Sequence, residues 1–491
     1  MVHAYTQNGY NIVIDSSSGS IHSMDDYAYA AVLAYKSAIA DGAAYRNGEI
    51  GQKIISGELK PDLLPDNPAE LLEYIDGIEH LISENQLFTD DIYEDVLKET
   101  ARFQQARRRA AAENGCGLKA VCLHVAHSCN LNCEYCFAAQ GKYQGRDALM
   151  SLEVAKKSLD FLIKHSGNHI NLDVDFFGGE PLLNRNVVKS TVAYGRELER
   201  KYNGRAGNPK KRFRFTLTTN GILIDDDVID FTNREMVNVV LSLDGRKHVH
   251  DSKRVDYNGQ GSYDKVVPKF QRLVKSRLEN AKAGGGSAEY YIRGTYTHEN
   301  PDFIEDIKHM LDLGFRELSL EPVVCSPEEP YALTDRDFDL LVRQYEELAE
   351  LSLEYEKKGD PFNFYHYMID LEHGPCIHKK LAGCGSGTEY IAITPQGDIY
   401  PCHQFAGDEK YLLGNIYDGI MRSEIMCEFA DNNIFTRDDC AKCWAQLYCA
   451  GGCAANAYHA TGDIRGNYAY GCELFKKRIE CAIARKISLS E

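Results

Sequence analysis

Residues 118–137, LKAVCLHVAHSCNLNCEYCF, decide the fold and the chemistry expected of this chain. The apolar run 118–127 predicts a buried β-strand. Cys129, Cys133 and Cys136 follow at once with the spacing C-x3-C-x2-C. A loop after a barrel strand lies at the carboxyl end of the sheet, where barrel enzymes build their active sites. The three cysteines are therefore expected in one loop at an active-site edge.

Strand-like and helix-like segments alternate from this stretch to residue 330. The predicted strands lie within 118–127, 170–181, 212–221, 237–245, 288–300 and 317–324. Amphipathic helical patterns separate them, and Ser151 stands where a helix N-cap is expected. Six alternations predict an α/β fold with a parallel sheet and outer helices, an open partial (β/α)6 TIM-type barrel.

The flanking segments predict further domains. Tight turns at Asn8-Gly9 and Ser18-Gly19 indicate a small strand–turn–strand module followed by helices. A long polar helix then reads as a connector, and ten of the sixteen cysteines lie beyond residue 371. The expected divisions are 1–90 (module), 91–115 (linker helix), 116–330 (barrel), 331–370 (bridging helix region) and 371–491 (cysteine-rich domain).

Composition narrows the class of protein. The net charge of −18 argues against a nucleic-acid-binding surface. The N-terminus shows no signal peptide and no apolar run is long enough to span a membrane, so a cytoplasmic protein is expected. Because that compartment is reducing, sixteen cysteines are expected to bind metal rather than to form disulfides.

Three thiolates in one loop suit an iron–sulfur cluster with four irons. The fourth iron would then be open to a ligand that the protein does not supply. Zinc is the alternative, because His124 or His127 could complete a four-coordinate site.

The cysteine motif resembles that of the radical SAM superfamily, which opens S-adenosylmethionine (SAM) at such a cluster. The resemblance implies that SAM yields a 5′-deoxyadenosyl radical, with Cys129, Cys133 and Cys136 as the catalytic cluster ligands. It also assigns SAM contacts along the predicted barrel. These are Tyr135 near the adenine; Gly178, Gly179, Glu180 and Pro181 at the methionine amino group; Asn220, Ser242 and Asp244 lining the site; and Arg293 at the carboxylate. Helix caps, turns, a core aromatic and a solvated strand residue are the structural alternatives for these positions.

The C-terminal cysteines resemble those of the SPASM domain, which holds auxiliary [4Fe–4S] clusters. By that resemblance one cluster is bound by Cys440, Cys443, Cys449 and Cys472, and the other by Cys384, Cys402 and Cys453. Cys376 is either the eighth ligand or leaves an iron open to a substrate thiolate. SAM and three [4Fe–4S] clusters are thus the implied cofactors, and a zinc ribbon is the alternative. No chemistry is assigned to Cys116, Cys122, Cys325, Cys427 and Cys481.

The order of domains resembles radical SAM enzymes that modify ribosomal (RiPP) peptides. The N-terminal module is similar to winged-helix-like recognition elements, which bind a precursor's leader as an added strand. Over nearly its full length the chain most resembles the SCIFF maturases, which form thioethers between cysteine sulfur and carbon in a cysteine-rich peptide. The resemblance implies two partners for this chain: a cysteine-rich precursor peptide, and a reductant such as flavodoxin or ferredoxin. The alternatives are a sulfatase-maturing enzyme making formylglycine, a carbon–carbon crosslinker, an iron–sulfur redox scaffold and, for the module, a dimerisation domain.

Overall fold

The computed structural model describes residues 1–91, 93–143, 145, 147–204, 210–371 and 377–490. The chain begins with a three-stranded antiparallel sheet in the order β1 (Val2–Gln7), β2 (Tyr10–Asp15), β3 (Ser20–Met24). The turn between β1 and β2 needs positive φ at Asn8 and Gly9, which are residues that tolerate it. Three helices follow: α1 (Asp26–Ala40), α2 (Glu49–Ile55) and α3 (Pro68–Ser83).

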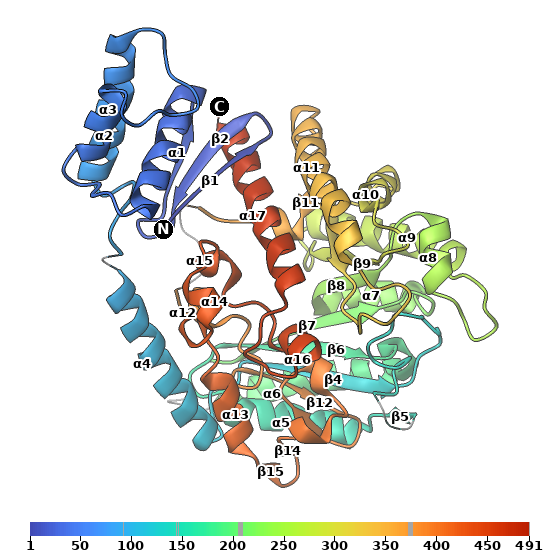
Figure 1. The fold of residues 1–491 in the computed structure, drawn as a ribbon. Helices are drawn as coiled ribbons and strands as arrows, with labels where there is room; N and C mark the ends of the chain where they lie inside the picture. Colours follow the sequence, from blue (N-terminus) through green and yellow to red (C-terminus); the bar gives the residue numbers. More distant parts are fainter. Residues whose placement is uncertain (92, 144, 146, 205–209, 372–376, 491) are drawn as a thin grey trace.

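The two faces of this small sheet pack against different parts of the chain. Val13 points to the module's own helices, where it joins a cluster with Val32 and Tyr35. Ile12 and Ile14 point to the other face, where they pack with residues of the C-terminal helix α17 (Ala469–Ser490) and with Trp444. Strand side chains alternate in direction, so successive residues serve both cores. Figure 1 shows β1 and β2 beside α17.

The predicted linker helix is α4 (Glu94–Glu113). It packs along α13 (Ser423–Ala430) and also meets α12 (Ile377–Ala382). Gln105 and Arg109 both bind the carboxylate of Asp431. The helix is therefore fastened to the C-terminal domain along its length and is more than a connector.

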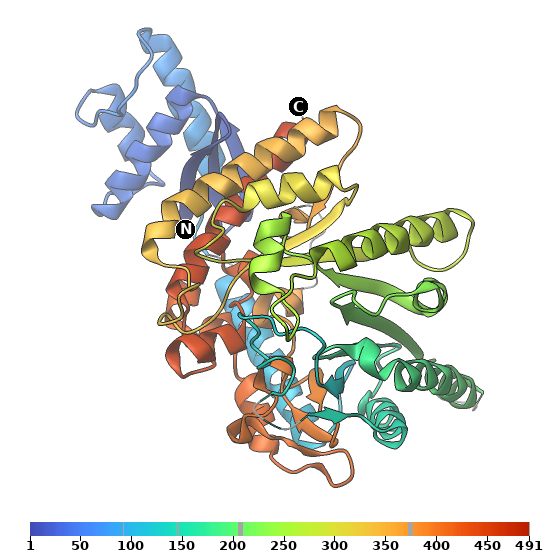
Figure 2. The same cartoon turned by 90° about the vertical axis from the view of Figure 1, so that its right-hand side faces the viewer.

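A mostly parallel sheet forms the centre of the molecule. Six of its strands run in sequence order: β4 (Ala120–His127), β6 (Asn171–Gly178), β7 (Arg212–Thr219), β8 (Met236–Ser242), β9 (Tyr290–Tyr296) and β10 (Glu317–Pro322). The helices between them are α5 (Leu152–His165), α6 (Arg185–Asn203), α7 (Asp226–Glu235), α8 (Lys247–Lys253), α9 (Tyr263–Lys282) and α10 (Phe303–Asp312). The prediction of an α/β partial barrel is confirmed, and Figure 2 shows helices stacked along the outside of the curved sheet. The Ser151 side chain accepts a hydrogen bond from the Val154 amide, as the predicted N-cap of α5 should.

The sheet continues past the predicted ends of the barrel domain. After α11 (Asp335–Lys357), the short strand β11 (Asn363–Phe364) adds in parallel to β10. At the opposite edge β12 (Tyr390–Ile393) pairs in parallel with β4. The sheet thus runs from the barrel through the bridging region and into the cysteine-rich region.

The remaining elements are short. They are β5 (Ala148–Leu149), β13 (Asp398–Tyr400), β14 (Gly414–Asn415), β15 (Gly419–Ile420), α14 (Asp438–Ala441), α15 (Gln446–Cys449), α16 (Ala454–Thr461), and the 3₁₀ turns η1 (Pro181–Asn184), η2 (Tyr365–Tyr367), η3 (His403–Phe405), η4 (Glu409–Tyr411) and η5 (Ile434–Thr436). Within the described part of the chain, no helix has the length and apolar character needed to cross a membrane.

Candidate functional site

The three-cysteine loop begins where β4 ends. Its backbone is tied to the end of α8 and the residues that follow, since the Asn132 amide donates to the Val255 carbonyl at 2.7 Å and the Glu134 amide donates to the Lys253 carbonyl at 3.1 Å. Cys129, Cys133 and Cys136 are all partly buried. The fold therefore presents the three thiols together at the carboxyl end of the parallel strands.

The two glycines after β6 let that strand end touch the cysteine loop. The Gly179 amide donates to the Ala126 carbonyl at 2.7 Å. A Cβ on Gly179 would lie 2.1 Å from the Ser128 carbonyl oxygen, and one on Gly178 would lie 2.3 Å from that of Ala126. Gly178 also has a φ of +126°, which favours glycine. Both glycines are thus required for two backbone segments to meet beside Cys129.

Glu180 joins the ends of two neighbouring strands. Its carboxylate is fully buried and accepts hydrogen bonds from the Leu182 amide, the Thr219 hydroxyl and the Asn220 amide at 2.8–2.9 Å. Burial raises the pKa of Glu180 to about 7, although these three hydrogen bonds act in the opposite direction. Pro181, also buried, starts the turn η1 that leads into α6.

Asn220, at the end of β7, lies directly against the cysteine loop. Its side-chain amide approaches the Cys129 sulfur at 3.6 Å and donates to the Asn130 side-chain oxygen at 2.8 Å. The Leu131 amide is also directed at the Cys129 sulfur, at 3.4 Å. Donors pointed at a sulfur favour a thiolate, so Cys129 is equipped as a cluster ligand.

Asp244, after β8, is the centre of a buried polar group. Its carboxylate accepts hydrogen bonds from the Tyr135 hydroxyl at 2.5 Å, from Arg254 at 2.9 and 3.1 Å, and from the Thr295 amide at 3.0 Å. Burial alone would raise the pKa of Asp244, but Arg254, His250 and Tyr135 together outweigh it and hold that pKa below its usual range. The guanidinium also lies over the Tyr135 ring, at 5.5 Å.

Arg254 is a residue that the sequence interpretation missed. Its positive charge lies close enough to Cys133 to oppose the effect of burial, which raises the pKa of that thiol to about 11. The sequence signal was weak, because a cation after the short helix α8 resembles any surface residue. Tyr135 is distant in the chain from Asp244 and Arg254, and only the fold brings all three to the cluster loop.

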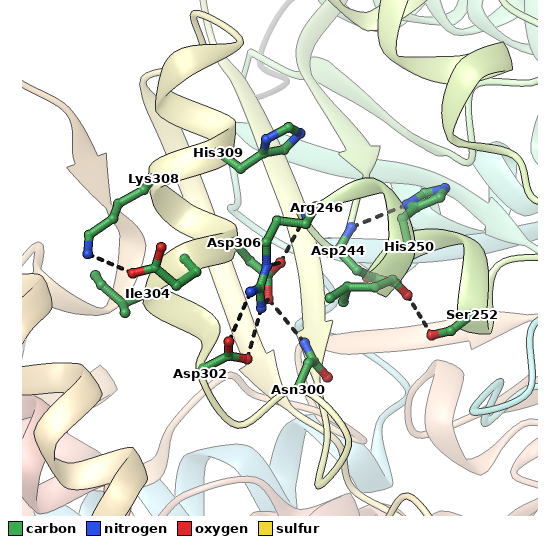
Figure 3. A network of polar contacts seen from close by, with 12 residues as sticks. Asp244, Arg246, His250, Ser252, Asn300, Asp302, Ile304, Asp306, Lys308 and His309 are labelled. Atoms are coloured by element: carbon green, nitrogen blue, oxygen red, sulfur yellow. Dashed lines mark hydrogen bonds and ion pairs between the residues drawn. The ribbon is translucent and has the colours of Figure 1, made fainter.

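A second ion-pair network holds the turn that carries Asp244 in place (Figure 3). Arg246 donates to Asp306 at 2.8 Å through its side chain and at 2.9 Å through its backbone amide, and it binds both carboxylate oxygens of Asp302 at 2.8 and 2.9 Å. Gly245 has a φ of +125°, and a Cβ there would lie 2.2 Å from that of Asp306. The turn therefore packs directly on α10, which fixes the position of Asp244.

Ser242 and Arg293 are register neighbours on β8 and β9. Arg293 is exposed on β9, within electrostatic reach of Glu321 on β10 and of His403. Burial, and then Arg293, lower the pKa of His403 to about 4, so this imidazole is neutral. The region beside the cysteine loop is thus lined by an exposed arginine and half-buried polar side chains.

The chemistry of the three-cysteine loop fits an iron–sulfur cluster with one open iron. Burial raises the pKa of Cys129 to about 12, so the thiol alone stays protonated and a bound cation is needed to stabilise the thiolate. Backbone and side-chain N–H groups already point at that sulfur. Among the described residues, no three His, Cys, Asp or Glu side chains converge as a single metal ion would require.

The C-terminal domain brings its thiols together in two groups. Burial raises the pKa values of Cys402 and Cys449, and further increases come from nearby thiols: Cys453 and Cys384 act on Cys402, whereas Cys472, Cys440 and Cys443 act on Cys449. These neighbours fall into the same two sets that the resemblance to the SPASM domain implies, whose members alternate along the sequence. Cys384 and Cys453 are exposed, whereas Cys402 is buried. Cys376, the eighth candidate ligand, lies outside the described residues.

The five cysteines without a motif belong to neither group. Cys122, on β4, is fully buried against Tyr390, and Cys481 is buried in α17. Cys427 is buried in α13, Cys325 follows β10, and Cys116 is exposed ahead of β4.

Comparison with known proteins agrees with this architecture. The radical SAM superfamily model matches residues 123–307, and the model of the SPASM iron–sulfur cluster-binding domain matches residues 384–444. The radical SAM cyclopropyl synthase TigE of Paramaledivibacter caminithermalis is 23% identical over 408 residues, which is 79% of either chain. The cysteine-type anaerobic sulfatase-maturating enzyme of Clostridium perfringens is 26% identical over 74% of this chain and 95% of its own.

A solved structure shares the fold. That of native anSMEcpe with bound AdoMet superposes with a TM-score of 0.58 at 22% identity, over 75% of this chain and 98% of its own. These matches agree with two features of the structure: the cysteine loop at the carboxyl end of a parallel sheet, and the grouped thiols of the C-terminal domain. Together they identify the family of the chain. It is a radical SAM enzyme with a C-terminal SPASM domain, related to the anaerobic sulfatase-maturating enzymes and to the radical SAM cyclopropyl synthase.

Proposed function

We propose that this enzyme joins cysteine sulfur to carbon in a cysteine-rich, ribosomally made precursor peptide of the SCIFF type. The observation that carries the proposal is the N-terminal module, whose sheet packs one face against the C-terminal domain and has an edge strand, β3, without an outer strand partner among the described residues. In the described structure β3 pairs with β2 alone, so its outer edge is available to an added strand. Strand addition is a common way to bind an extended peptide.

The other edge strand, β1, also pairs with β2 alone, and its side chains contact the C-terminal domain through the face of the sheet. His3 on β1 stacks on Trp444 with ring centroids 4.1 Å apart and bonds to Glu480 of α17 at 2.8 Å. Trp444 directly follows Cys443, one of the proposed cluster ligands. A leader bound at β3 would therefore be held on a platform fixed to the auxiliary clusters, while the rest of the peptide reaches the barrel.

The residues of this chain have distinct roles in the proposed reaction. When bound, SAM and the reduced cluster on Cys129, Cys133 and Cys136 would supply a 5′-deoxyadenosyl radical that removes one hydrogen atom from the peptide. Asp244, Tyr135 and Arg254 hold the cluster loop, and Ser242 and Arg293 face the space where SAM would lie. The remaining SAM contacts proposed here are Gly178, Gly179, Glu180, Pro181 and Asn220.

The second half of the proposed reaction concerns the peptide's sulfur. Cys384, Cys402 and Cys453 supply three thiols, of which the first and last are exposed, and a peptide thiol could take the fourth position if Cys376 does not. That thiol would lose a proton and the auxiliary clusters would accept one electron as the sulfur–carbon bond forms. Each crosslink thus removes two hydrogen atoms from the peptide.

The test is anaerobic incubation of the reconstituted enzyme with SAM, reductant and a six-cysteine precursor, followed by mass spectrometry. We expect the loss of two hydrogen atoms per crosslink, together with 5′-deoxyadenosine. A core peptide without its leader should react far more slowly, and Cys129→Ala should give neither product. If Cys129→Ala gave the same mass loss, the proposal would be wrong.

A second candidate function is oxidation of a cysteine or serine to formylglycine. The 95% coverage of the C. perfringens sulfatase-maturating enzyme favours it. That product carries an aldehyde, which a hydrazide probe labels and a thioether does not. Labelling of a sulfatase-type peptide, with no crosslink in the six-cysteine precursor, would decide for this alternative.

A further inference from the structure

Arg437 is a buried cation whose hydrogen bonds, in the described part of the chain, go to neutral groups. Its side chain is 5% exposed. The guanidinium donates to the carbonyl oxygens of Gly451 at 2.6 Å, Ile464 at 2.7 Å and Gly466 at 3.2 Å, and to the Asn432 side-chain oxygen at 2.9 Å. Among the described residues, no carboxylate lies within ion-pair distance of it. A buried charge without a counter-charge is costly, so an anion is expected nearby.

The carbonyls that hold Arg437 belong to the loops that carry the SPASM cysteines. Gly451 lies between Cys449 and Cys453, Gly466 precedes Cys472, and Arg437 itself directly precedes the helix α14 that contains Cys440. Its side chain also lines a small cavity with Cys384, Gly385 and Gly452. One guanidinium therefore connects the loops of both auxiliary thiol groups.

Arg277 is a second buried arginine that donates to backbone carbonyls, and it provides a comparison because no cysteine is among its electrostatic neighbours. It is fully buried at the amino ends of β8 and β9, and it donates to the carbonyls of Thr232, Met236, Val237 and Glu289. Burial lowers the pKa of Arg277 to about 10. Burial also lowers the pKa of Arg437, but there the thiols of Cys440, Cys449, Cys472 and Cys453 act against it. Arg437 thus lies in the field of the thiols, which Arg277 does not.

We propose that Arg437 is the shared counter-ion of the two auxiliary clusters and raises their reduction potentials. This inference rests on the proposed function, in which Cys440, Cys443, Cys449 and Cys472 hold one cluster and Cys384, Cys402 and Cys453 bind the other. A cluster bound by thiolates is negatively charged, and each electron added makes it more so. Net charge and nearby hydrogen bonds set the potential of such clusters. A fixed buried cation beside them stabilises the reduced state and makes the clusters better electron acceptors.

The test compares Arg437→Gln with Arg437→Lys in a background that carries Cys129→Ala, Cys133→Ala and Cys136→Ala. In that background only the auxiliary clusters contribute to an anaerobic redox titration followed by electron paramagnetic resonance. Arg277→Gln is the matched control, because it removes a buried guanidinium that donates to carbonyls far from any thiol group. Iron content is measured for every variant.

With Arg437→Gln we expect the ratio of reduced to oxidised cluster at the parent protein's midpoint to fall about tenfold, or about 59 mV for one electron. Arg437→Lys should shift the midpoint by less than half as much, and Arg277→Gln should leave it unchanged. The inference would be overturned by an unchanged midpoint in Arg437→Gln or by equal midpoint shifts in Arg437→Gln and Arg437→Lys. Equal loss of iron from these two variants would also overturn it. Absence of auxiliary iron from the parent background would instead contradict the assignment of the clusters.

Discussion

Arg254 and Asp244 form a buried ion pair beside Cys133, with Nε donating to Oδ2 at 2.9 Å and Nη2 to Oδ1 at 3.1 Å. The Asp244 side chain is 1% exposed. Arg254→Gln would leave a buried carboxylate short of its cation, so we expect it to lower the free energy of unfolding by about 3 kcal/mol. We also expect less iron at the three-cysteine loop, because Arg254 holds Tyr135 and Asp244 together. Denaturant unfolding and iron analysis measure both effects.

Arg185→Gln is the control for Arg254. Its ion pair with Asp225 lies at the surface, where the two side chains are 46% and 49% exposed. Exposed pairs contribute at most about 1 kcal/mol. Similar losses in the two variants would show that the buried pair near Cys133 has no special role.

Gly179→Ala is expected to displace the cysteine loop. The added Cβ would lie 2.1 Å from the Ser128 carbonyl oxygen, a backbone atom that cannot rotate away. The site should therefore lose most of its SAM-dependent 5′-deoxyadenosine formation and part of its iron. Gly77→Ala, in the exposed face of α3 with nothing near its Cβ, should instead stabilise the chain by about 0.5–1 kcal/mol. Product analysis and thermal unfolding of both variants test this contrast.

The barrel could be predicted because its signals are local. Each of the six parallel strands between 118 and 324 has its own pattern of apolar residues, and Ser151 caps α5 through a contact three residues away. The joins to other regions could not be predicted in this way. β11 has two residues and β12 has four, too few for a periodic pattern, and both are placed by pairing with strands that are distant in sequence.

Site residues that belong to a sequence motif could be predicted. Residues that join the site through contacts with partners distant in the chain could not. The resemblance of the cysteine spacings to the SPASM domain predicted two sets of ligands, and thiols of each set lie near one another in the structure. By contrast, Arg108 lies in the run ARRRAAAE, which looks like a solvated helix face, yet it is 8% exposed and faces Glu389 at 3.6 Å. Arg254 and the Trp444 platform were missed for the same reason, because they meet partners that are distant in the chain.

Cys384→Ala and Cys427→Ala separate cluster ligands from buried cysteines. Cys384 is exposed beside Cys402 and Cys453, so its loss should remove up to one cluster, or about four irons per chain. Cys427 packs in α13 away from both groups, so its loss should cost stability and leave iron unchanged. Iron and sulfide analysis after anaerobic reconstitution measures the difference. Equal iron in the two variants would contradict the ligand assignment of Cys384.

Glu180 gives the chain a stability that depends on pH. Its carboxyl is fully buried, and burial raises its pKa from 4.5 to about 7. Between these two values the folded chain binds this proton and the unfolded chain releases it. The contribution of Glu180 to stability is therefore most favourable below pH 4.5 and is lost as the pH rises through 7.

Glu180→Gln should remove this dependence, because the amide has the same size and does not titrate. From about pH 5 to about pH 8 the free energy of unfolding of the parent chain should fall by about 2 kcal/mol relative to the variant. Denaturant titrations at several pH values, on samples of equal iron content, give the two profiles. Parallel profiles would mean that the buried carboxyl is already ionised at the acidic end of this range, and that its three hydrogen bonds outweigh the cost of burying it.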